Sequence, residues 1–349
     1  MGNWCFEFRQ KARMTDSPRK RHWLRNVLIA LGAVALLIAI PVGVYAFSLS
    51  RTFDSKKETI EDVFPDETSR PTVPQGEAGK AENILLLGSD TRGELGDDLD
   101  DIRGQRSDTM MVAHIPADHK HVYIMSIMRD SWVDIPGHGQ AKVNAALSYG
   151  GIPLVVQTVE GLISARIDHV AIVDFSGFEG VTNALGGVEV NNDIGFNSSH
   201  LKGHYFPQGV QTMNGTEALA FVRERYAFAD GDFQRARNQQ AYLKAVIDKV
   251  LSAGTLLDPV KTNNLVSAIA PYLKVDKGFD SAYVASLILK MSSVRSGDIT
   301  FFTAPTAGTG TSDGGQSIVN LDAEKMKLLQ EAFRTDRLDT YQPELQTMQ

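Results

Sequence analysis

Cysteine is nearly absent from the chain, because Cys5 is the single cysteine in 349 residues. One thiol cannot close an intramolecular disulfide, so the hydrophobic core alone must hold the fold. The patterns GxxxxGK[ST] and HExxH are also absent, and the histidines are scattered, with His114, His119 and His121 flanking predicted strand ends. These absences argue against P-loop and zinc-protease chemistry. The glycine-rich segment 308–315 has no lysine, and a flexible loop is expected there rather than a phosphate cradle.

Acidic side chains outnumber basic ones outside the first 26 residues. Residues 1–26 carry seven basic side chains against two acidic ones, a net of +5, which leaves −12 on the rest of a chain whose total is −7. Nonspecific nucleic-acid binding needs a broad basic surface that neutralises phosphates. The acidic remainder therefore predicts no nucleic-acid partner.

Charge is absent altogether between Val27 and Ser50. At about 1.5 Å per residue, this apolar run is long enough to cross a hydrocarbon core of roughly 30 Å. The alternative is a cleaved signal peptide, but the run exceeds the usual h-region and no convincing cleavage site follows. We expect a single transmembrane helix, with residues 1–26 cytoplasmic and the remainder outside the cell membrane.

Beyond the span, the composition shifts twice. Residues 51–80 are polar, contain proline and show no apolar period, so they are interpreted as an extracytoplasmic linker. Residues 81–335 have the composition of one globular domain, and residues 336–349 are interpreted as a C-terminal tail.

The pattern within residues 81–335 predicts an α/β fold, namely a single α/β/α layered domain with a central mixed sheet. Near-continuous apolar runs imply strands that are covered on both faces. Strands are expected at 83–90, 109–116, 121–130, 169–175 and near 301–305. Helical periodicity predicts helices at 143–151, 153–165, 176–187, 215–225, 233–254 and 322–333. The apolar face of 153–165 is expected to be core or, alternatively, the lining of a channel for a lipid tail.

Arginines gather beside the predicted elements. They are Arg106, Arg129 at the end of a strand, and Arg223, Arg225, Arg235 and Arg237 within fifteen residues. Guanidinium groups suit bidentate contact with phosphate. Arg235 and Gln239 share one helix face, opposite the end of the preceding helix. The alternative is a set of surface salt bridges with Glu224, Asp230 and Asp232.

Two aspartates are expected at neighbouring strand ends. Asp90 ends the first predicted strand and Asp108 begins the second. Carboxylates arranged in this way suit Mg²⁺, which bridges protein carboxylates and substrate phosphates. The alternative is that both are turn-forming or strand-starting residues without a ligand.

Seven ordered motifs between about Lys80 and Phe333 resemble the LytR-CpsA-Psr family of cell-envelope phosphotransferases. They are NILLLGSDTRG, RSDTMMVAHI, SIMRDSWVDIPGHGQAKVNAALSYGG, DFSGF, LGGVEV, MNGTEALAFVRERY and GDFQRARNQQ. The segment ELGDDLDDIRGQ between the first two is longer and more acidic than is common in that family, which leaves the shape of the metal edge open.

The resemblance implies a magnesium-dependent enzyme that transfers a glycopolymer from a polyprenyl-pyrophosphate carrier to peptidoglycan. It implies metal binding by Asp90 and Asp108. It implies that Arg106, Arg129, Arg223, Arg225, Arg235 and Gln239 bind the pyrophosphate and that Asp232 lies close by. Arg129, Arg223, Arg225 and Asp232 are the expected catalytic residues. A pyrophosphate hydrolase and a noncatalytic lipid-binding regulator remain alternatives.

The predicted topology is testable on intact cells. Because seven basic residues precede the uncharged span, protease added to protoplasts should digest the domain after Arg51 and spare residues 1–26. An epitope at each end, read by immunoblot, reports both outcomes. Full protection of the domain would reverse the topology.

Overall fold

The computed structural model describes residues 50–89, 107–252 and 259–341. Residues 1–49 lie outside this part, so the basic segment and the predicted membrane span, apart from Ser50, remain predictions. Leu49–Gln349 forms one compact unit.

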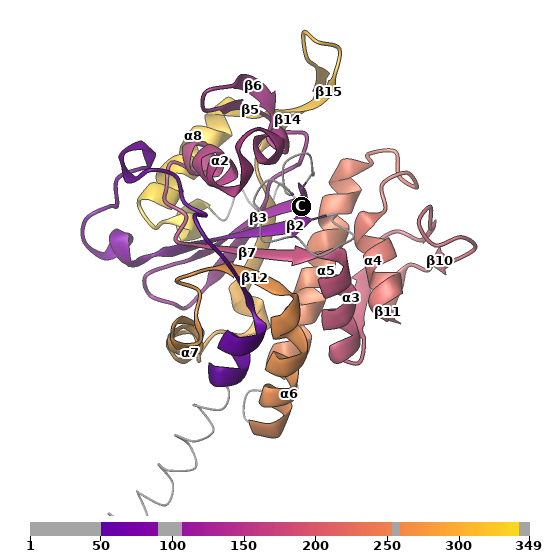
Figure 1. Ribbon diagram of the computed structural model, residues 1–349. Helices are drawn as coiled ribbons and strands as arrows, with labels where there is room; N and C mark the ends of the chain where they lie inside the picture. Colours follow the sequence, from indigo (N-terminus) through magenta and orange to yellow (C-terminus); the bar gives the residue numbers. More distant parts are fainter. Residues whose placement is uncertain (1–49, 90–106, 253–258, 342–349) are drawn as a thin grey trace, which may run out of the picture. The chain divides into compact units, whose positions relative to one another are not determined.

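A seven-stranded mixed sheet forms the centre of this unit (Figure 1). Its spatial order is β1-β12-β7-β2-β3-β4-β13. The pairs β1–β12, β7–β2 and β4–β13 are parallel, and the other neighbours are antiparallel. The strands are β1 (Glu58–Ile60), β2 (Glu82–Ser89), β3 (Ser107–Ile115), β4 (Val122–Ser126), β7 (His169–Asp174), β12 (Leu273–Asp276) and β13 (Ile299–Thr303).

Alternate residues of the sheet enter two different hydrophobic cores. Leu85 and Val112 join the large core that includes Leu329, whereas Ile84 and Ala113 join a second core on the opposite face. This period of two is the property of strands buried on both faces. The predicted layered α/β/α architecture with a mixed sheet is therefore confirmed.

Helices cover both faces of the sheet, with α2 and α8 on one face and α5 and α7 on the other (Figure 1). The helices are α2 (Ala145–Ile163), α3 (Phe175–Ala184), α4 (Gly215–Arg223), α5 (Asp232–Ser252), α6 (Pro259–Ile269), α7 (Ser281–Lys290) and α8 (Ala323–Arg334). Short 3₁₀ helices occupy Glu67–Ser69, Glu77–Lys80, Ala270–Tyr272 and Ser296–Asp298. Helix α2 is kinked where two helices were predicted, because Gly151 adopts φ 66° just before Pro153.

A smaller core lies beside the sheet. Val190, Phe206 and Met213 of two hairpins pack with Phe221 of α4 and Tyr242 of α5. The strands outside the central sheet are β5 (Trp132–Ile135), β6 (Gly139–Lys142), β8 (Val188–Asn192), β9 (Phe196–Asn197), β10 (Tyr205–Phe206), β11 (Gly209–Met213), β14 (Thr306–Thr311) and β15 (Ser317–Leu321). This core fixes α4 and α5 against one another.

In the part of the chain that the structure describes, α2 alone has the length and apolar composition of a membrane span. Half of its apolar window is buried inside the domain. Val155, Val159 and Ile163 have no exposed surface and belong to the large core. The packing favours the core interpretation of this helix over a lipid channel lining.

Residues 51–80 differ from the expected free linker. Phe53 and Val63 are buried, and β1 adds an edge strand to the central sheet by pairing with β12. Arg70 reaches the buried Glu160 of α2, with 2.7 Å between Nη2 and Oε1. The contacts that this segment makes with the domain are few and widely spaced, so its sequence has no apolar period. Residues 51–80 are nevertheless part of the folded domain.

Two further segments also depart from the expectations. Residues 308–315, expected to be a loop, belong to the β14–β15 hairpin. The sequence GTSDG at 310–314 has the pattern GxSxG, but it forms a strand end and a turn. It lacks the strand-to-helix turn that carries the nucleophile of a hydrolase. In the predicted tail, Leu338 and Tyr341 are buried in the large core. Asp336 accepts a hydrogen bond from the backbone N–H of Ala117 and lies 3.0 Å from His114 Nε2.

The ion pair between Arg70 and Glu160 provides a stability test. The two side chains are 7% and 1% exposed, so Arg70→Ala would leave a buried carboxylate without its cation. We expect a loss of about 3 kcal/mol in the free energy of unfolding, measured by denaturant titration. Lys80→Ala is the control, because its pair with Glu77 is exposed and should contribute under about 1 kcal/mol. Equal effects would mean that residues 51–80 are not an integral part of the fold.

Candidate functional site

The site lies where β2 and β3 meet at one end of the sheet. Their register pairs Gly88 with Thr109 and Ser89 with Ser107, so Asp108 is the additional residue of a β-bulge. The prediction that these strand ends are neighbours is confirmed. Asp90 and Arg106 lie outside the described residues, and nothing describes the Asp108 side chain, so the metal site stays a prediction. The described residues contain no cluster of three or more His, Cys, Asp or Glu side chains suited to a metal.

Arg129 follows β4, and its backbone holds it at the same end of the sheet. Its carbonyl accepts a hydrogen bond from Asn144 N–H, and the next carbonyl, that of Asp130, accepts one from Val319 N–H at 2.9 Å. The preceding Met128 packs on Ala236 of α5. The Arg129 Nε lies 3.7 Å from the Asp130 carboxylate, which also pairs with Lys142 at 3.3 Å. A second cation, Lys142, is thus brought to the strand end.

Arg223 and Arg225 lie at the junction after α4. Arg223 is the last residue of α4, and its guanidinium carbon lies 4.3 Å from the centre of the Phe175 ring, a cation–π contact. Phe175 begins α3 directly after β7, whose Asp174 pairs in register with Ser89 of β2. Arg223 therefore lies over the sheet end that leads to Asp90.

Arg225 and Arg235 share one carboxylate. Arg235 Nη2 lies 2.6 Å from Asp232 Oδ1, and Arg225 Nη1 lies 3.8 Å from the same oxygen. The hydrogen bond to Tyr226, together with the carboxylates of Asp232 and Asp130, raises the pKa of Arg225 above its ordinary value. Asp232 thus orients guanidinium groups from both sides of the α4–α5 connection, which suits positioning better than proton transfer.

Gln239 belongs to a row of amide side chains on α5 that face the end of α4. Its Nε2 donates to the carbonyl of Val222 at 3.4 Å, and Asn238 Nδ2 donates to the carbonyl of Phe221 at 3.1 Å. These amides satisfy carbonyls that a helix C-terminus leaves without intrahelical partners. The predicted contact of Gln239 with pyrophosphate stays a prediction.

The salt-bridge alternative holds for only part of the arginine cluster. Arg237 pairs with Asp230 and with Gln234, and its side chain is 39% exposed. Glu224 pairs with no arginine side chain in the described residues. It is buried and accepts hydrogen bonds from Ser199 and from backbone N–H groups of 225–227. Burial alone would raise the pKa of Glu224, but the hydrogen bonds from Ser199 and Ala227 hold it below its ordinary value.

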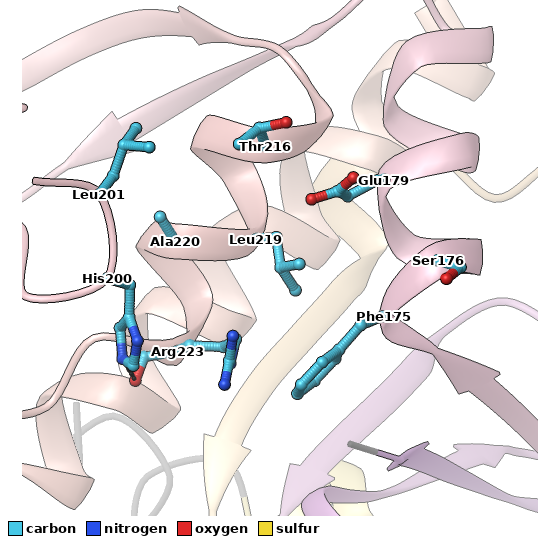
Figure 2. A pocket seen from close by; sticks show the side chains of 9 residues that line it. All are labelled: Phe175, Ser176, Glu179, His200, Leu201, Thr216, Leu219, Ala220 and Arg223. Atoms are coloured by element: carbon cyan, nitrogen blue, oxygen red, sulfur yellow. Dashed lines mark hydrogen bonds between the residues drawn. The ribbon is translucent and has the colours of Figure 1, made fainter. Parts of the chain in front are cut away.

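Sequence reasoning missed a cleft of about 290 Å³ that ends on Arg223 (Figure 2). One face of α4 forms its floor, and α3 and the loop at His200 form its sides. The lining residues are Phe175, Ser176, Glu179, His200, Leu201, Thr216, Leu219, Ala220 and Arg223. The spacing 216, 219, 220 and 223 marks one helix face, but nothing in the sequence reveals which segment covers that face.

Arginines thus follow β4, end α4 and begin α5, three segments that contact one another through Met128, Ala236 and the amides of α5. Clustered guanidinium groups are typical of proteins that bind phosphate groups. The LytR_cpsA_psr family model matches residues 44–335 of the chain. The chain belongs to this family.

Relatives and solved structures agree with the family assignment. The chain is 30% identical to the polyisoprenyl-teichoic acid–peptidoglycan teichoic acid transferase TagU of Enterococcus faecalis, over 88% of this chain and 95% of TagU. It is 31% identical to the cell wall biosynthesis protein LcpA of Corynebacterium glutamicum over 71% of this chain, but the match spans only 55% of LcpA. The crystal structure of Bacillus subtilis TagV is similar, with a TM-score of 0.64 and 27% identity, covering 74% of this chain and 98% of TagV.

The two arginines Arg235 and Arg237 provide a matched test of anion binding, since they lie on one helix and only Arg237 is paired at the surface. Arg235→Lys keeps the charge but removes the planar fork. We expect roughly tenfold to hundredfold weaker binding of inorganic pyrophosphate by calorimetry, corresponding to one lost charge-assisted contact of about 1.5–3 kcal/mol. Arg237→Lys should bind like the unchanged protein. Equal affinities for both variants, with unchanged thermal unfolding, would remove Arg235 from the anion site.

Proposed function

We propose that the chain transfers a glycopolymer from a polyprenyl-pyrophosphate carrier to peptidoglycan and leaves a phosphodiester link. The observation that carries this proposal is the shared carboxylate of Asp232, which contacts both Arg225 and Arg235 on a helix that also packs against Met128, the residue before Arg129. The activity for which TagU is named, transfer of teichoic acid from a polyisoprenyl carrier to peptidoglycan, supports it. The identity of the polymer is left open by these residues.

The proposed reaction is a displacement at the sugar-proximal phosphorus. A peptidoglycan hydroxyl oxygen forms a bond to that phosphorus, the bond to the bridging oxygen breaks, and polyprenyl phosphate leaves. The hydroxyl proton passes to a phosphate oxygen or to water. Arg129, Arg223 and Arg225 stabilise the negative charge on the transferring and leaving phosphates, and such electrostatic stabilisation is the main source of catalysis in phosphoryl transfer. A single arginine finger contributes about 10³–10⁵ in rate in other systems, so no covalent nucleophile is required.

Magnesium is the proposed cofactor, held by Asp90 and Asp108. The β2–β3 register supports this role, because Ser89, the residue before Asp90, pairs with Ser107, the residue before Asp108. Oxygen ligands from few carboxylates, completed by substrate phosphates, are what Mg²⁺ prefers. When bound, the ion would neutralise phosphate charge, and Arg106 is proposed to bind the same pyrophosphate.

The proposed localisation is the outer face of the cell membrane, with Val27–Ser50 as a single anchor and residues 1–26 in the cytoplasm. A membrane-bound enzyme meets a polyprenyl carrier in the bilayer that holds both. Residues 50–56 are helical and lead directly into β1, so any anchor before them would join the domain without a long flexible spacer.

A transfer assay with the full-length chain in nanodiscs tests the proposal. Polyprenyl-pyrophosphate glycan and peptidoglycan fragments should yield a phosphodiester-linked product by mass spectrometry. Asp90→Asn and Asp108→Asn should each lower turnover and flatten its dependence on added Mg²⁺, while thermal unfolding stays unchanged. Asp118→Asn is the control, because this exposed residue only bonds its own turn.

Release of free glycan phosphate without linked product would instead assign the hydrolase reaction. Tight binding of the carrier without either product would assign a regulatory lipid-binding role. Turnover and Mg²⁺ dependence in Asp90→Asn and Asp108→Asn that equal those of Asp118→Asn would leave Asp90 and Asp108 as turn residues.

A further inference from the structure

The cleft beside Arg223 runs along one face of α4. Thr216, Leu219, Ala220 and Arg223 follow one another at intervals of three, one and three residues, so they line up on one side of the helix. At about 1.5 Å per residue, the line from Thr216 to Arg223 extends about 10 Å. This is the scale of a disaccharide. We name the cleft, with its nine lining residues, the α4 groove.

The chemistry of the α4 groove is mixed. Its floor offers the apolar surfaces of Leu219 and Ala220, while polar side chains stand at its margins. In Figure 2, Glu179 projects from α3 toward α4, and the Phe175 ring lies beside the Arg223 guanidinium. An apolar floor with polar groups at the margin suits a ring that has apolar faces and hydroxyl groups on its edge.

Several of these polar groups are available to a ligand. Within residues 50–89, 107–252 and 259–341, the side chains of Ser176, Glu179 and Thr216 have no hydrogen-bond partner. His200 lies with Nε2 3.1 Å from the carbonyl of Arg223, so Nε2 carries a proton and donates to that oxygen. The other nitrogen of the same ring has no hydrogen-bond partner among the described residues.

The carboxylate of Glu179 disfavours a phosphate-rich polymer along the part of this cleft distant from Arg223. Glu179 would repel each phosphate that passed it, and Arg223 is the single permanent cation in the lining. A neutral chain of hydroxyl groups and amides meets no such penalty, because a carboxylate accepts hydrogen bonds from both. The ligand chemistry that fits is therefore an uncharged or weakly charged pyranose.

We infer that the α4 groove is a sugar-binding subsite that holds a pyranose pair and ends at the phosphate-binding arginines. This inference rests on the proposed transferase function, since the donor has a sugar next to the reacting phosphorus and the attacking hydroxyl of the acceptor belongs to a sugar. The sugars come either from the first residues of the carrier-linked glycan or from the peptidoglycan strand. Either source offers the same hydroxyl and acetamido groups.

Glu179→Gln and Thr216→Trp test the subsite in the full-length chain. The first removes the charged acceptor, and the second fills the far end of the groove. Glu189→Gln and Thr212→Trp are matched controls, because these exposed residues pair across β8 and β11, outside the cleft. We expect Glu179→Gln to lower kcat/KM about tenfold for one substrate, as the loss of a charge-assisted contact does. Thr216→Trp should lower kcat/KM for the same substrate by at least as much, because the indole occupies the space of the sugar. The controls should stay within about twofold.

The two arms of the assay identify the source. A loss with varied carrier-linked glycan at saturating peptidoglycan assigns the groove to the donor, and the reverse assigns it to the acceptor. Saturation-transfer NMR with the disaccharide N-acetylglucosaminyl-N-acetylmuramic acid and with free N-acetylglucosamine reads sugar binding without any transfer. If the unchanged chain transfers nothing yet binds sugar through Glu179, the proposed function fails and the subsite stands. Unchanged kcat/KM on both substrates, with sugar signals equal to those of the controls, would overturn the subsite.

Discussion

The packing of α5 against α4, β4 and β13 links the segments that carry the arginines of the site. One row of amide side chains on this helix makes the contacts. Asn238 and Gln239 bond the last carbonyls of α4, while Gln240 bonds Ser126 of β4 and Phe302 and Thr303 of β13. A buried amide that lost its partner would cost about 1–3 kcal/mol, so the row fixes the register of α5 against both neighbours. The end of α4, the start of α5 and the end of β4 are thereby held as one rigid corner.

Charge within that corner is arranged for orientation more than for stability. Arg235 is nearly buried and meets the partly buried Asp232, a pair whose Coulomb attraction is largely offset by the desolvation of both ions. Asp130 plays a similar part between Arg129 and Lys142. The acids fix the guanidinium planes while the corner keeps more basic than acidic groups. A domain with net negative charge thus retains a local excess of positive charge.

Much of this fold could be predicted because its central strands are buried on both faces and its long helices have clear ends. The strands predicted at 83–90 and 109–116 correspond to β2 and β3, and the asparagine and glutamate of NGTE form the capping box that begins α4. The edge strand β1 and its neighbour β12 have three and four residues, too few for a periodic pattern. The buried positions of Val63, Leu338 and Tyr341 depend on contacts with distant residues, which local composition does not encode.

The candidate site was also predictable only in part. Residue type and spacing predicted that Arg225 and Arg235 would meet across a helix connection, because both flank one short turn. Spacing alone could not distinguish Arg237 from Arg235. Arg237 differs in that its side chain faces Asp230 and solvent. The α4 groove was also invisible, since α3 and the His200 loop approach α4 only through tertiary packing. Contacts between segments distant in sequence, rather than local chemistry, set this limit.

Transfer to a sugar hydroxyl must compete with attack by water, and the geometry of α4 bears on that competition. Under the proposed function, the groove and Arg223 belong to one helix of nine residues, so a sugar on its face and a phosphate at its end keep a fixed separation. Holding reactants in a fixed geometry removes translational and rotational freedom before the reaction, which contributes about 7–11 kcal/mol in the most favourable cases. A water molecule does not bind along the groove and is therefore not positioned in this way. The same arginines can therefore favour ligation over hydrolysis without a separate element that excludes solvent.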